Sequence, residues 1–599
     1  MISKTPQFDK ALNEILDNLK PHKRVCNECK MNFEIFKEDI DFYYKLRVPP
    51  QTLCPNCRFQ RILGYRVFYL PIFYKRKCYA PNHNEEIISY YSKYNKVKVY
   101  DDTYYSSQKW DAMEFLQEYN FNKSFFEQFK EFSFKVPHQS LRKDSNSVNS
   151  DYVVGGISAK NCYYVSIPYN SENIYYGSLP IYSRDSIDVF YIHNVEYSYS
   201  SFKLYNSYNC DFSSYSENCI DSNFLYDCRN CSNCFGCFNL RNKQYCFFNK
   251  QLSKEEYLKK MKVINLGKRT VVKEYKEKFE KFKFKAIRKC VNNTKIENSI
   301  GNDLRMCKNC FYCFDLINNC EDLRYVRDSD NGKDSMDVFG LVKSSFVYES
   351  TSAISVSNVK FSIIVKEGLE VEYSSELRNC EYMFGCFGLK NKKYCIFNKQ
   401  YSEDEYFKMI DKIKTQMLKQ GEYGEFFPLK DSFFPYNDTA FIEFPLTKEE
   451  VLKKGWYWQD DVKSDLDLSK LDIIEAKDMP NDIADVDESI LKKAIICEKT
   501  KKPFKITKFE LDFYRKKNIP LPTVHPLERI KELVFKKEPF ILLHRKCQCA
   551  GKESDNKIYE NTIEHFHKND HCPNEFQTVY APDKPEIVYC EKCYLAEVV

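Results

Sequence analysis

The chain has 599 residues, of which 43% are hydrophobic and 29% charged, and its formal net charge is +6 at pH 7. This length exceeds what one hydrophobic core supports and predicts three to five domains. The mildly basic balance singles out no partner, and a content of only 16 glycines argues against a disordered low-complexity chain. No apolar run near the N-terminus is long enough for a signal peptide or a membrane span, so we expect no membrane segment.

The first 109 residues predict a short helix followed by a zinc module. Residues 1–20 are amphipathic, and residues 21–109 contain two CxxC pairs followed by a helical run from Arg58. Two such pairs form two knuckles whose thiolates complete a tetrahedron around zinc, as in treble-clef and zinc-ribbon modules. The expected Zn²⁺ ligands are Cys26, Cys29, Cys54 and Cys57. A site made only of cysteines is closed, which predicts a structural rather than a catalytic metal.

Residues 110–144 are predicted to be a helical connector, because aromatic residues recur there at helical spacing. The chain then contains one long stretch twice. Asp185–Phe190 returns as Asp334–Phe339, and Phe235–Cys246 returns as Phe384–Cys395, both at an offset of 149 residues. A short fixed period, rich in Asn, Ser, Tyr and Phe, predicts two β-solenoid segments, at residues 145–250 and 291–400.

Cysteines punctuate the first solenoid copy. Cys210, Cys219, Cys228, Cys237 and Cys246 recur every nine residues. Two of these and two more form a run spaced by three, namely Cys228, Cys231, Cys234 and Cys237, which could either bind zinc or pack inward as small hydrophobic side chains. The second copy has Leu377 and Met383 at two of these positions, which favours packing.

A helix is predicted after each copy, because Ser253 with Glu256 and Ser402 with Glu405 form capping boxes. Residues 251–290 form a basic helical segment, with fifteen Lys or Arg against five Glu between Lys250 and Cys290. Residues 401–490 are predicted to contain a helix and an acidic linker, with eleven Asp or Glu against three Lys in residues 460–490. The two charged runs are either solvated, or paired with each other.

Residues 491–599 resemble the N-terminal module at an offset of 471 residues, which aligns Cys26 with Cys497 and Arg58 with Arg529. The four zinc positions become Cys497, Thr500, His525 and Glu528, so this first site is predicted to be metal-free. A second site follows, whose expected Zn²⁺ ligands are Cys547, Cys549, Cys590 and Cys593. Because a CxC pair can be a strained chelate, Cys572, His567 and His571 are alternative ligands. In the N-terminal module this second site is degenerate, with Asp101 and Tyr104 at the cysteine positions.

Four stretches carry a family resemblance, namely Cys54–Arg58, Phe235–Gln251, Phe513–Pro520 and Cys572–Cys593. They resemble a family of uncharacterised cysteine-rich zinc-ribbon proteins of candidate-phyla bacteria, some of which carry a CaiB/BaiF label. The family often has a CPxC where this sequence has His525-Pro-Leu-Glu528. The resemblance implies no known activity. The predicted fold is therefore mainly β with α: duplicated β-solenoid segments flanked by treble-clef or zinc-ribbon-like modules at both ends.

Three functions remain open. The first is a non-enzymatic, zinc-stabilised scaffold that binds nucleic acid or protein in the cytoplasm, where the many cysteines would stay reduced. A polyanion would contact Arg58, Arg61, Arg66, Lys276, Lys278, Lys281 and Lys283. The second is a carbohydrate-active β-helix with Asp185, Asp188, Asp334 and Asp337 as carboxylates. The third is a transferase, for which the sequence offers no phosphate loop or nucleophile elbow.

Overall fold

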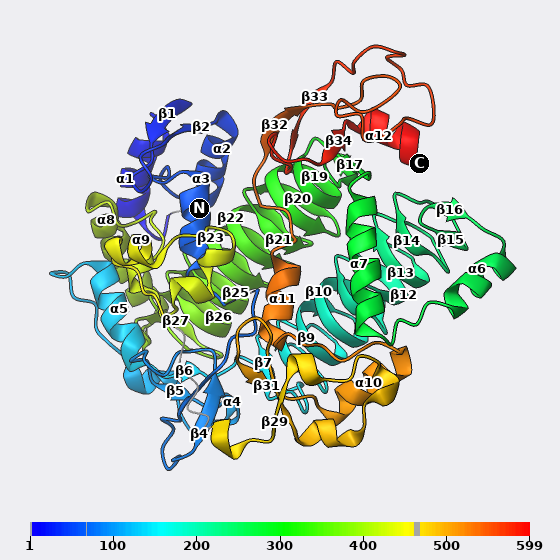
Figure 1. Cartoon of the computed structure of the whole chain (residues 1–599). Helices are drawn as coiled ribbons and strands as arrows, with labels where there is room; N and C mark the ends of the chain where they lie inside the picture. Colours follow the sequence, from blue (N-terminus) through cyan, green and yellow to red (C-terminus); the bar gives the residue numbers. More distant parts are fainter. Residues whose placement is uncertain (1–2, 68, 461–467) are drawn as a thin grey trace.

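The computed structural model describes residues 3–67, 69–460 and 468–599. It has a mixed α/β architecture built on a long β-solenoid, with cysteine clusters near both termini, which confirms the predicted fold class (Figure 1). The solenoid forms two almost wholly parallel sheets. The first runs from β7 (Tyr152–Val154) to β16 (Lys250–Gln251), and the second runs from β18 (Thr294–Glu297) to β28 (Lys399–Gln400).

Most coils of the solenoid contain twelve residues, because side-chain and backbone bonds between neighbouring coils join residues separated by 12. At the start of the second copy the separation is 11 between β18 and β19 (Ile300–Ile317) and 13 between β19 and β20 (Cys320–Arg324). Every third residue has a left-handed backbone, as at Asn209, Phe212, Tyr215 and Asn218, whose φ values are 51°, 53°, 52° and 55°. A coil therefore has four sides of three residues with a left-handed corner on each. The nine-residue beat of the cysteines corresponds to three sides, not to the length of the coil.

Small polar side chains share the narrow interior of the coils with aliphatic residues such as Val189 and Leu225. The Ser201 hydroxyl donates to the carbonyl of Cys210 at 3.1 Å and accepts from the backbone N–H of Ser213 at 3.2 Å. The thiol of Cys228 likewise donates to the carbonyl of Cys237 at 3.5 Å. These bonds satisfy backbone groups that would otherwise be buried without partners. Serine and cysteine thus suit the same inward positions, because both are small and both carry a donor.

The four cysteines spaced by three occupy consecutive inward positions of the first copy and are at most 1% exposed. Among the described residues, the clusters with metal-ligand geometry do not include them. This supports packing over zinc for Cys228, Cys231, Cys234 and Cys237.

Asparagines form a ladder along one row of corners. The side chain of Asn218 donates to Asn230 at 3.0 Å, and Asn230 donates to Asn242 at 2.9 Å. Asparagine tolerates the left-handed conformation better than most residues, and its amide can bond to the same residue of the next coil. The corner geometry therefore accounts for the asparagine content that the sequence shows.

The two end modules share one succession of elements. In the N-terminal module these are β1 (His22–Val25), β2 (Asn32–Ile35), α2 (Lys37–Leu46), α3 (Pro55–Leu63), β3 (Tyr74–Lys77), β4 (Glu86–Ser89), β5 (Val99–Tyr100) and α4 (Asp102–Ser106), preceded by α1 (Pro6–Leu16). In the C-terminal module they are β30 (Ala494–Ile496), β31 (Pro503–Phe504), α10 (Lys508–Lys517), α11 (Pro526–Val534), β32 (Leu543–Lys546), β33 (Glu575–Thr578), β34 (Ile587–Tyr589) and α12 (Glu591–Val598).

The modules pack crosswise on the solenoid. Helix α3 of the N-terminal module lies on β22 (Lys333–Val342) and β23 (Ser345–Ile354) of the second copy, whereas α11 of the C-terminal module lies on β9 (Glu172–Ile181) and β10 (Arg184–Glu196) of the first copy (Figure 1). Equivalent buried ion pairs hold the two contacts. Arg58 Nε lies 2.9 Å from Asp337 Oδ2, and Arg529 Nε lies 2.8 Å from Asp188 Oδ2.

The second half of each module pairs with a strand that directly precedes a solenoid copy. Strand β5 runs parallel to β6 (His138–Gln139), just ahead of the first copy, and β34 runs parallel to β17 (Ile287–Lys289), just ahead of the second copy. Each end module also contacts the other copy through a ring: the Phe73 ring lies 5.0 Å from that of Tyr164 in the first copy, and the Phe540 ring lies 5.4 Å from that of Phe314 in the second copy.

Helices pack on aromatic rings near the end of each copy. The Phe125 ring of α5 (Phe125–Lys135) lies 5.5 Å from that of Phe384 in the second copy. The Tyr275 ring of α7 (Arg269–Lys283) lies 5.1 Å from that of Phe235 in the first copy. The predicted capping boxes begin α6 (Lys254–Lys262) and α8 (Glu403–Lys419).

The acidic stretch differs from a plain linker. Its residues 461–467 lie outside the described residues, but β29 (Ile473–Glu475) adds a parallel strand beside β30, and Ile483 and Ile490 are buried. The buried apolar residues of this stretch attach it to the C-terminal module. A prediction from charge alone does not take these residues into account.

The buried interior predicts how the solenoid thiols react. Cys210, Cys219 and Cys228 are 0% exposed, so they should be inert to a water-soluble thiol reagent in the native protein and reactive after denaturation. Mass spectrometry of the labelled peptides before and after guanidinium treatment measures this difference. Rapid labelling of these three cysteines in the native state would contradict the inward stack.

Candidate metal centres and a basic pocket

The N-terminal zinc candidates come together as predicted. Cys26 follows β1, Cys54 caps the start of α3, and Cys57 lies in its first turn. With Cys29, their sulfur atoms lie within 4.8 Å of one another, and the Sγ atoms of Cys29 and Cys54 are 3.7 Å apart. Four thiolates bound tetrahedrally at the usual Zn–S length are about 3.8 Å apart. This cluster therefore has the size of a zinc site.

The duplicated position in the C-terminal module keeps the loop without the ligand set. Cys497 Sγ accepts from the backbone N–H of His525 at 3.2 Å, as Cys26 Sγ accepts from Cys54 at 3.3 Å. Burial would raise the pKa of Cys497, but hydrogen bonds from Thr500 and His525 lower it overall. Glu528 pairs with Lys531 at 2.9 Å. Hydrogen bonds stabilise this knuckle, and its lack of a metal stays a prediction.

The second C-terminal site differs from the predicted set by one ligand. The buried cluster consists of Cys547, Cys572, Cys590 and Cys593, whose sulfur atoms lie within 4.8 Å of one another. Cys572 Sγ lies 3.9 Å from Cys590 Sγ and 3.7 Å from Cys593 Sγ. The prediction of Cys549 in this set is therefore corrected to Cys572, one of the alternatives. Cys549 is only two residues from Cys547, and its thiol lies beside His565 instead.

A neighbouring cluster contains the displaced cysteine. Cys549, His565, His567 and Cys593 also bring their ligand atoms within 4.8 Å of one another. His571, the other predicted alternative, contacts Asp555 instead, at 2.5 Å. Sequence reasoning missed His565, although its spacing of two from His567 could have revealed the pair.

The degenerate second site of the N-terminal module still brings four possible metal ligands together. Cys78, His83, Glu85 and Asp101 lie within 4.8 Å of one another, but the group is partly exposed. Asp101 caps α4 as Cys590 precedes α12. The duplication thus places an acid where the C-terminal module has a thiol.

The arginines predicted to contact a polyanion lie in the interior, which corrects that assignment. Arg58 is 2% exposed and pairs with Asp337. Arg61 pairs with both Glu349 and Glu425. Arg66 is 8% exposed, with its guanidinium 5.4 Å from the ring of Phe339. Local sequence charge does not reveal burial beneath a second segment of the chain.

The predicted lysines are arranged differently. Lys276, Lys278 and Lys281 are exposed on α7. Lys283 is partly buried, pairs with Glu280 at 2.6 Å, and lies 5.7 Å from the ring centre of Tyr226. The start of α7 meets the acidic segment through Asn481, whose carbonyl accepts from the backbone of Arg269 at 2.9 Å.

The carboxylates considered for carbohydrate chemistry have architectural contacts. Asp188 and Asp337 lie under α11 and α3, paired with arginine. Asp185 accepts from the corner amide of Asn173 at 2.7 Å, and Asp334 pairs with Lys45. All four lie at left-handed corners of the coils.

A cavity of about 480 Å³ opens where the first copy, the start of the second copy and the C-terminal module meet. Its lining is basic and aromatic. The cations are Lys203, Arg229, Arg241, Arg288, Lys289, Lys295 and Arg305, the acids are Asp227, Asp303 and Glu591, and the tyrosines are Tyr205, Tyr215, Tyr226, Tyr580 and Tyr594. We call this cavity the basic pocket.

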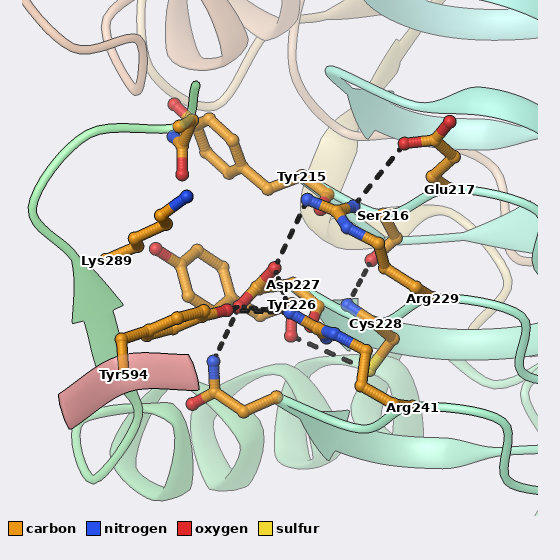
Figure 2. Close-up of polar contacts among 12 residues, drawn as sticks. Tyr215, Ser216, Glu217, Tyr226, Asp227, Cys228, Arg229, Arg241, Lys289 and Tyr594 are labelled. Atoms are coloured by element: carbon orange, nitrogen blue, oxygen red, sulfur yellow. Dashed lines mark hydrogen bonds and ion pairs between the residues drawn. The ribbon is translucent and has the colours of Figure 1, made fainter. Parts of the chain in front are cut away.

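Asp227 contacts two arginines and a tyrosine at one wall of the basic pocket. Figure 2 shows it between the guanidinium groups of Arg229 and Arg241, at 3.6 and 3.1 Å, with the hydroxyl of Tyr594 also bonded to it. On other walls, cations stack on rings. Arg305 lies 4.0 Å from the ring centre of Tyr205, and Arg288 lies 4.7 Å from that of Tyr226. The tyrosine faces hold the guanidinium groups at the cavity wall.

Comparison of the two solenoid copies shows which contacts of the basic pocket belong to the shared fold. Glu376 in the second copy corresponds to Asp227 and likewise accepts from a module tyrosine, Tyr105, at 3.3 Å. By contrast, Ile364 and Ser375 stand where the first copy has Tyr215 and Tyr226. The acid–tyrosine contact therefore belongs to the shared fold, whereas the aromatic lining is specific to the basic pocket.

Comparison with protein-family models, curated proteins and solved structures finds no match. The family resemblance therefore stays a prediction. Among the helices of the described residues, none is both long and apolar enough to cross a membrane.

The interface between the C-terminal module and the first copy predicts a pH dependence. Burial raises the pKa of Glu510 to about 7, although it accepts from Tyr176 at 2.9 Å. The unfolded chain releases this proton near pH 4.5, so between these values the folded state holds more protons and stability falls as pH rises. Between pH 4.5 and pH 8, ionisation of Glu510 should lower the free energy of unfolding of wild type by about 3 kcal/mol. The Glu510→Gln variant cannot ionise at this position and should not show this loss.

Denaturant unfolding of wild type and variant at both pH values measures this difference. As pH rises, the free energy of unfolding of Glu510→Gln should increase relative to that of wild type. Parallel pH profiles would show that Glu510 is already ionised in the folded protein.

Proposed function

We propose that the chain is a non-enzymatic, zinc-stabilised scaffold that binds a polyanion, with single-stranded nucleic acid as the ligand, at the basic pocket. The observation that carries this proposal is the excess of cations over acids in a tyrosine-lined cavity at the junction of three parts of the fold. Cationic grooves that contain aromatic rings suit single strands, because phosphates meet the charges and bases stack on the rings.

Zinc in this proposal is structural. It would bind at Cys26, Cys29, Cys54 and Cys57, and at Cys547, Cys572, Cys590 and Cys593, because both sets have tetrahedral dimensions and consist of thiolates alone. Closed sites of this kind stabilise small modules, since binding free energy becomes folding free energy. The second cluster lies next to the basic pocket, which Glu591 and Tyr594 of α12 help to line.

The exposed face of α7 extends the positive surface toward the basic pocket. Lys276, Lys278 and Lys281 lie along the helix, and Lys283 at its end shares the ring of Tyr226 with Arg288. A strand longer than the cavity could therefore follow α7, with its phosphates over the lysines. The buried arginines of the N-terminal module have no part in this contact.

A protein partner is the second candidate, favoured by the many polar contacts that already occupy the cations of the pocket, such as Arg305 with Glu217 at 3.1 Å. The carbohydrate alternative is weaker, because Asp188 and Asp337 are paired with buried arginines. The many unpaired cysteines support a reducing compartment such as the cytoplasm.

A fluorescence-anisotropy titration with a labelled single-stranded oligonucleotide tests the proposal. The logarithm of affinity should fall linearly with the logarithm of salt concentration. Arg229→Glu should weaken binding at least tenfold at low salt, because it places a negative charge at the cavity wall. The matched control is Arg378→Glu, the exposed equivalent in the second copy, which should bind within about twofold of wild type.

The alternatives give different results. Absence of oligonucleotide binding even at low salt would overturn the nucleic-acid proposal and leave a protein partner as the better candidate. Equal weakening by Arg229→Glu and Arg378→Glu would show that binding follows net charge rather than the basic pocket.

A further inference from the structure

We propose that the C-terminal module holds two metal ions that share the thiolate of Cys593, so that the chain binds three zinc ions in all. This rests on the proposed zinc at the two all-cysteine clusters and adds a third ion. The new ion would be held by Cys549, His565, His567 and Cys593, which are brought together in one cluster.

The ligand count provides for a second ion. Seven side chains surround this part of the module, and Cys593 belongs to both groups of four. Zinc in a structural site takes four ligands, so one ion cannot use all seven. Two tetrahedra that share one corner use seven ligands, and a thiolate has the lone pairs to bridge two ions.

The distances match this arrangement. His565 Nδ1 lies 3.6 Å from Cys549 Sγ, and His567 Nε2 lies 3.3 Å from Cys593 Sγ. A nitrogen and a sulfur bound to one tetrahedral zinc are about 3.6 Å apart. On the other side of the shared thiolate, Cys593 Sγ lies 3.7 Å from Cys572 Sγ, close to the separation expected for two sulfur ligands.

Both histidines are oriented as metal ligands. His565 Nε2 lies 2.9 Å from Glu597 Oε1, and His567 Nδ1 lies 2.6 Å from the carbonyl of Asp570. Histidines that bind metal usually donate their second ring N–H to a carboxylate or a carbonyl, which fixes the tautomer. Here the bonded nitrogen in each ring is the one that faces away from the cluster, so the other nitrogen faces the sulfur atoms with its lone pair.

Neighbouring groups suit a charged cluster. The side-chain amide of Asn561 donates to Cys549 Sγ at 3.2 Å, and that of Asn574 donates to Cys590 Sγ at 3.3 Å. Such bonds stabilise thiolates. His565 is 3% exposed and its ring contacts Glu597, which also accepts from the backbone of Thr562 at 3.0 Å. Helix α12 thus supplies both the bridging thiolate and the carboxylate that positions His565.

Elemental analysis of the purified full-length protein tests the inference, together with its intact mass under native conditions. Wild type should contain three zinc ions per chain. Cys549→Ser and His567→Ala should each contain two, because the all-cysteine cluster keeps its four ligands. Cys54→Ser should also contain two and serves as the control that removes the N-terminal ion. His83→Ala should keep three, which excludes the partly exposed Cys78 cluster as the source of the third ion.

Cobalt substitution provides a readout that does not depend on the variants folding. Two high-spin Co²⁺ ions that share a thiolate couple magnetically, so the electron paramagnetic resonance signal should be smaller than three isolated ions would give. A wild-type content of two zinc ions, unchanged in Cys549→Ser, would overturn the shared site while leaving the proposed zinc modules intact. A content of zero would overturn both.

Discussion

Two buried arginine–aspartate pairs determine how this chain is assembled. Arg58 reaches from the N-terminal module into the second solenoid copy, and Arg529 reaches from the C-terminal module into the first. Burying two charges is costly, and the pair is stable only when both partners are present and well positioned. Removing one partner leaves an unpaired buried charge, at a cost of about 3–5 kcal/mol. Each pair therefore couples one end of the chain to a coil hundreds of residues away.

The crosswise arrangement explains why the ends are duplicated along with the repeat. Each module packs a helix on one copy and pairs a strand with the segment that precedes the other, through β5 with β6 and β34 with β17. Residues that recur at the offsets of 149 and 471 serve this shared architecture. Residues that do not recur, such as Tyr226 in the basic pocket and His565 in the C-terminal module, are where the two halves have diverged, and our functional proposals rest on those.

Much of this architecture was predictable from sequence, because duplication preserves spacing. The two solenoid copies, the capping boxes at Ser253 and Ser402 and the N-terminal cysteine cluster follow from local patterns that need no knowledge of distant contacts. The length of a coil did not follow, because successive cysteines are three sides apart whereas a coil has four sides, and the corners carry many residue types besides asparagine. The exchange of Cys549 for Cys572 and the burial of Arg58 depend on which distant segments meet, which spacing does not encode.

Hydrogen exchange of the amides of α3 and α11 in two single variants tests most directly whether the two modules pack crosswise on the solenoid. In Asp188→Ala, exchange should accelerate in α11, more than 300 residues away in sequence, while α3 stays protected. In Asp337→Ala, exchange should accelerate in α3 while α11 stays protected. If Asp188→Ala instead loosens α3, or leaves α11 as protected as in wild type, the modules do not pack crosswise on the solenoid.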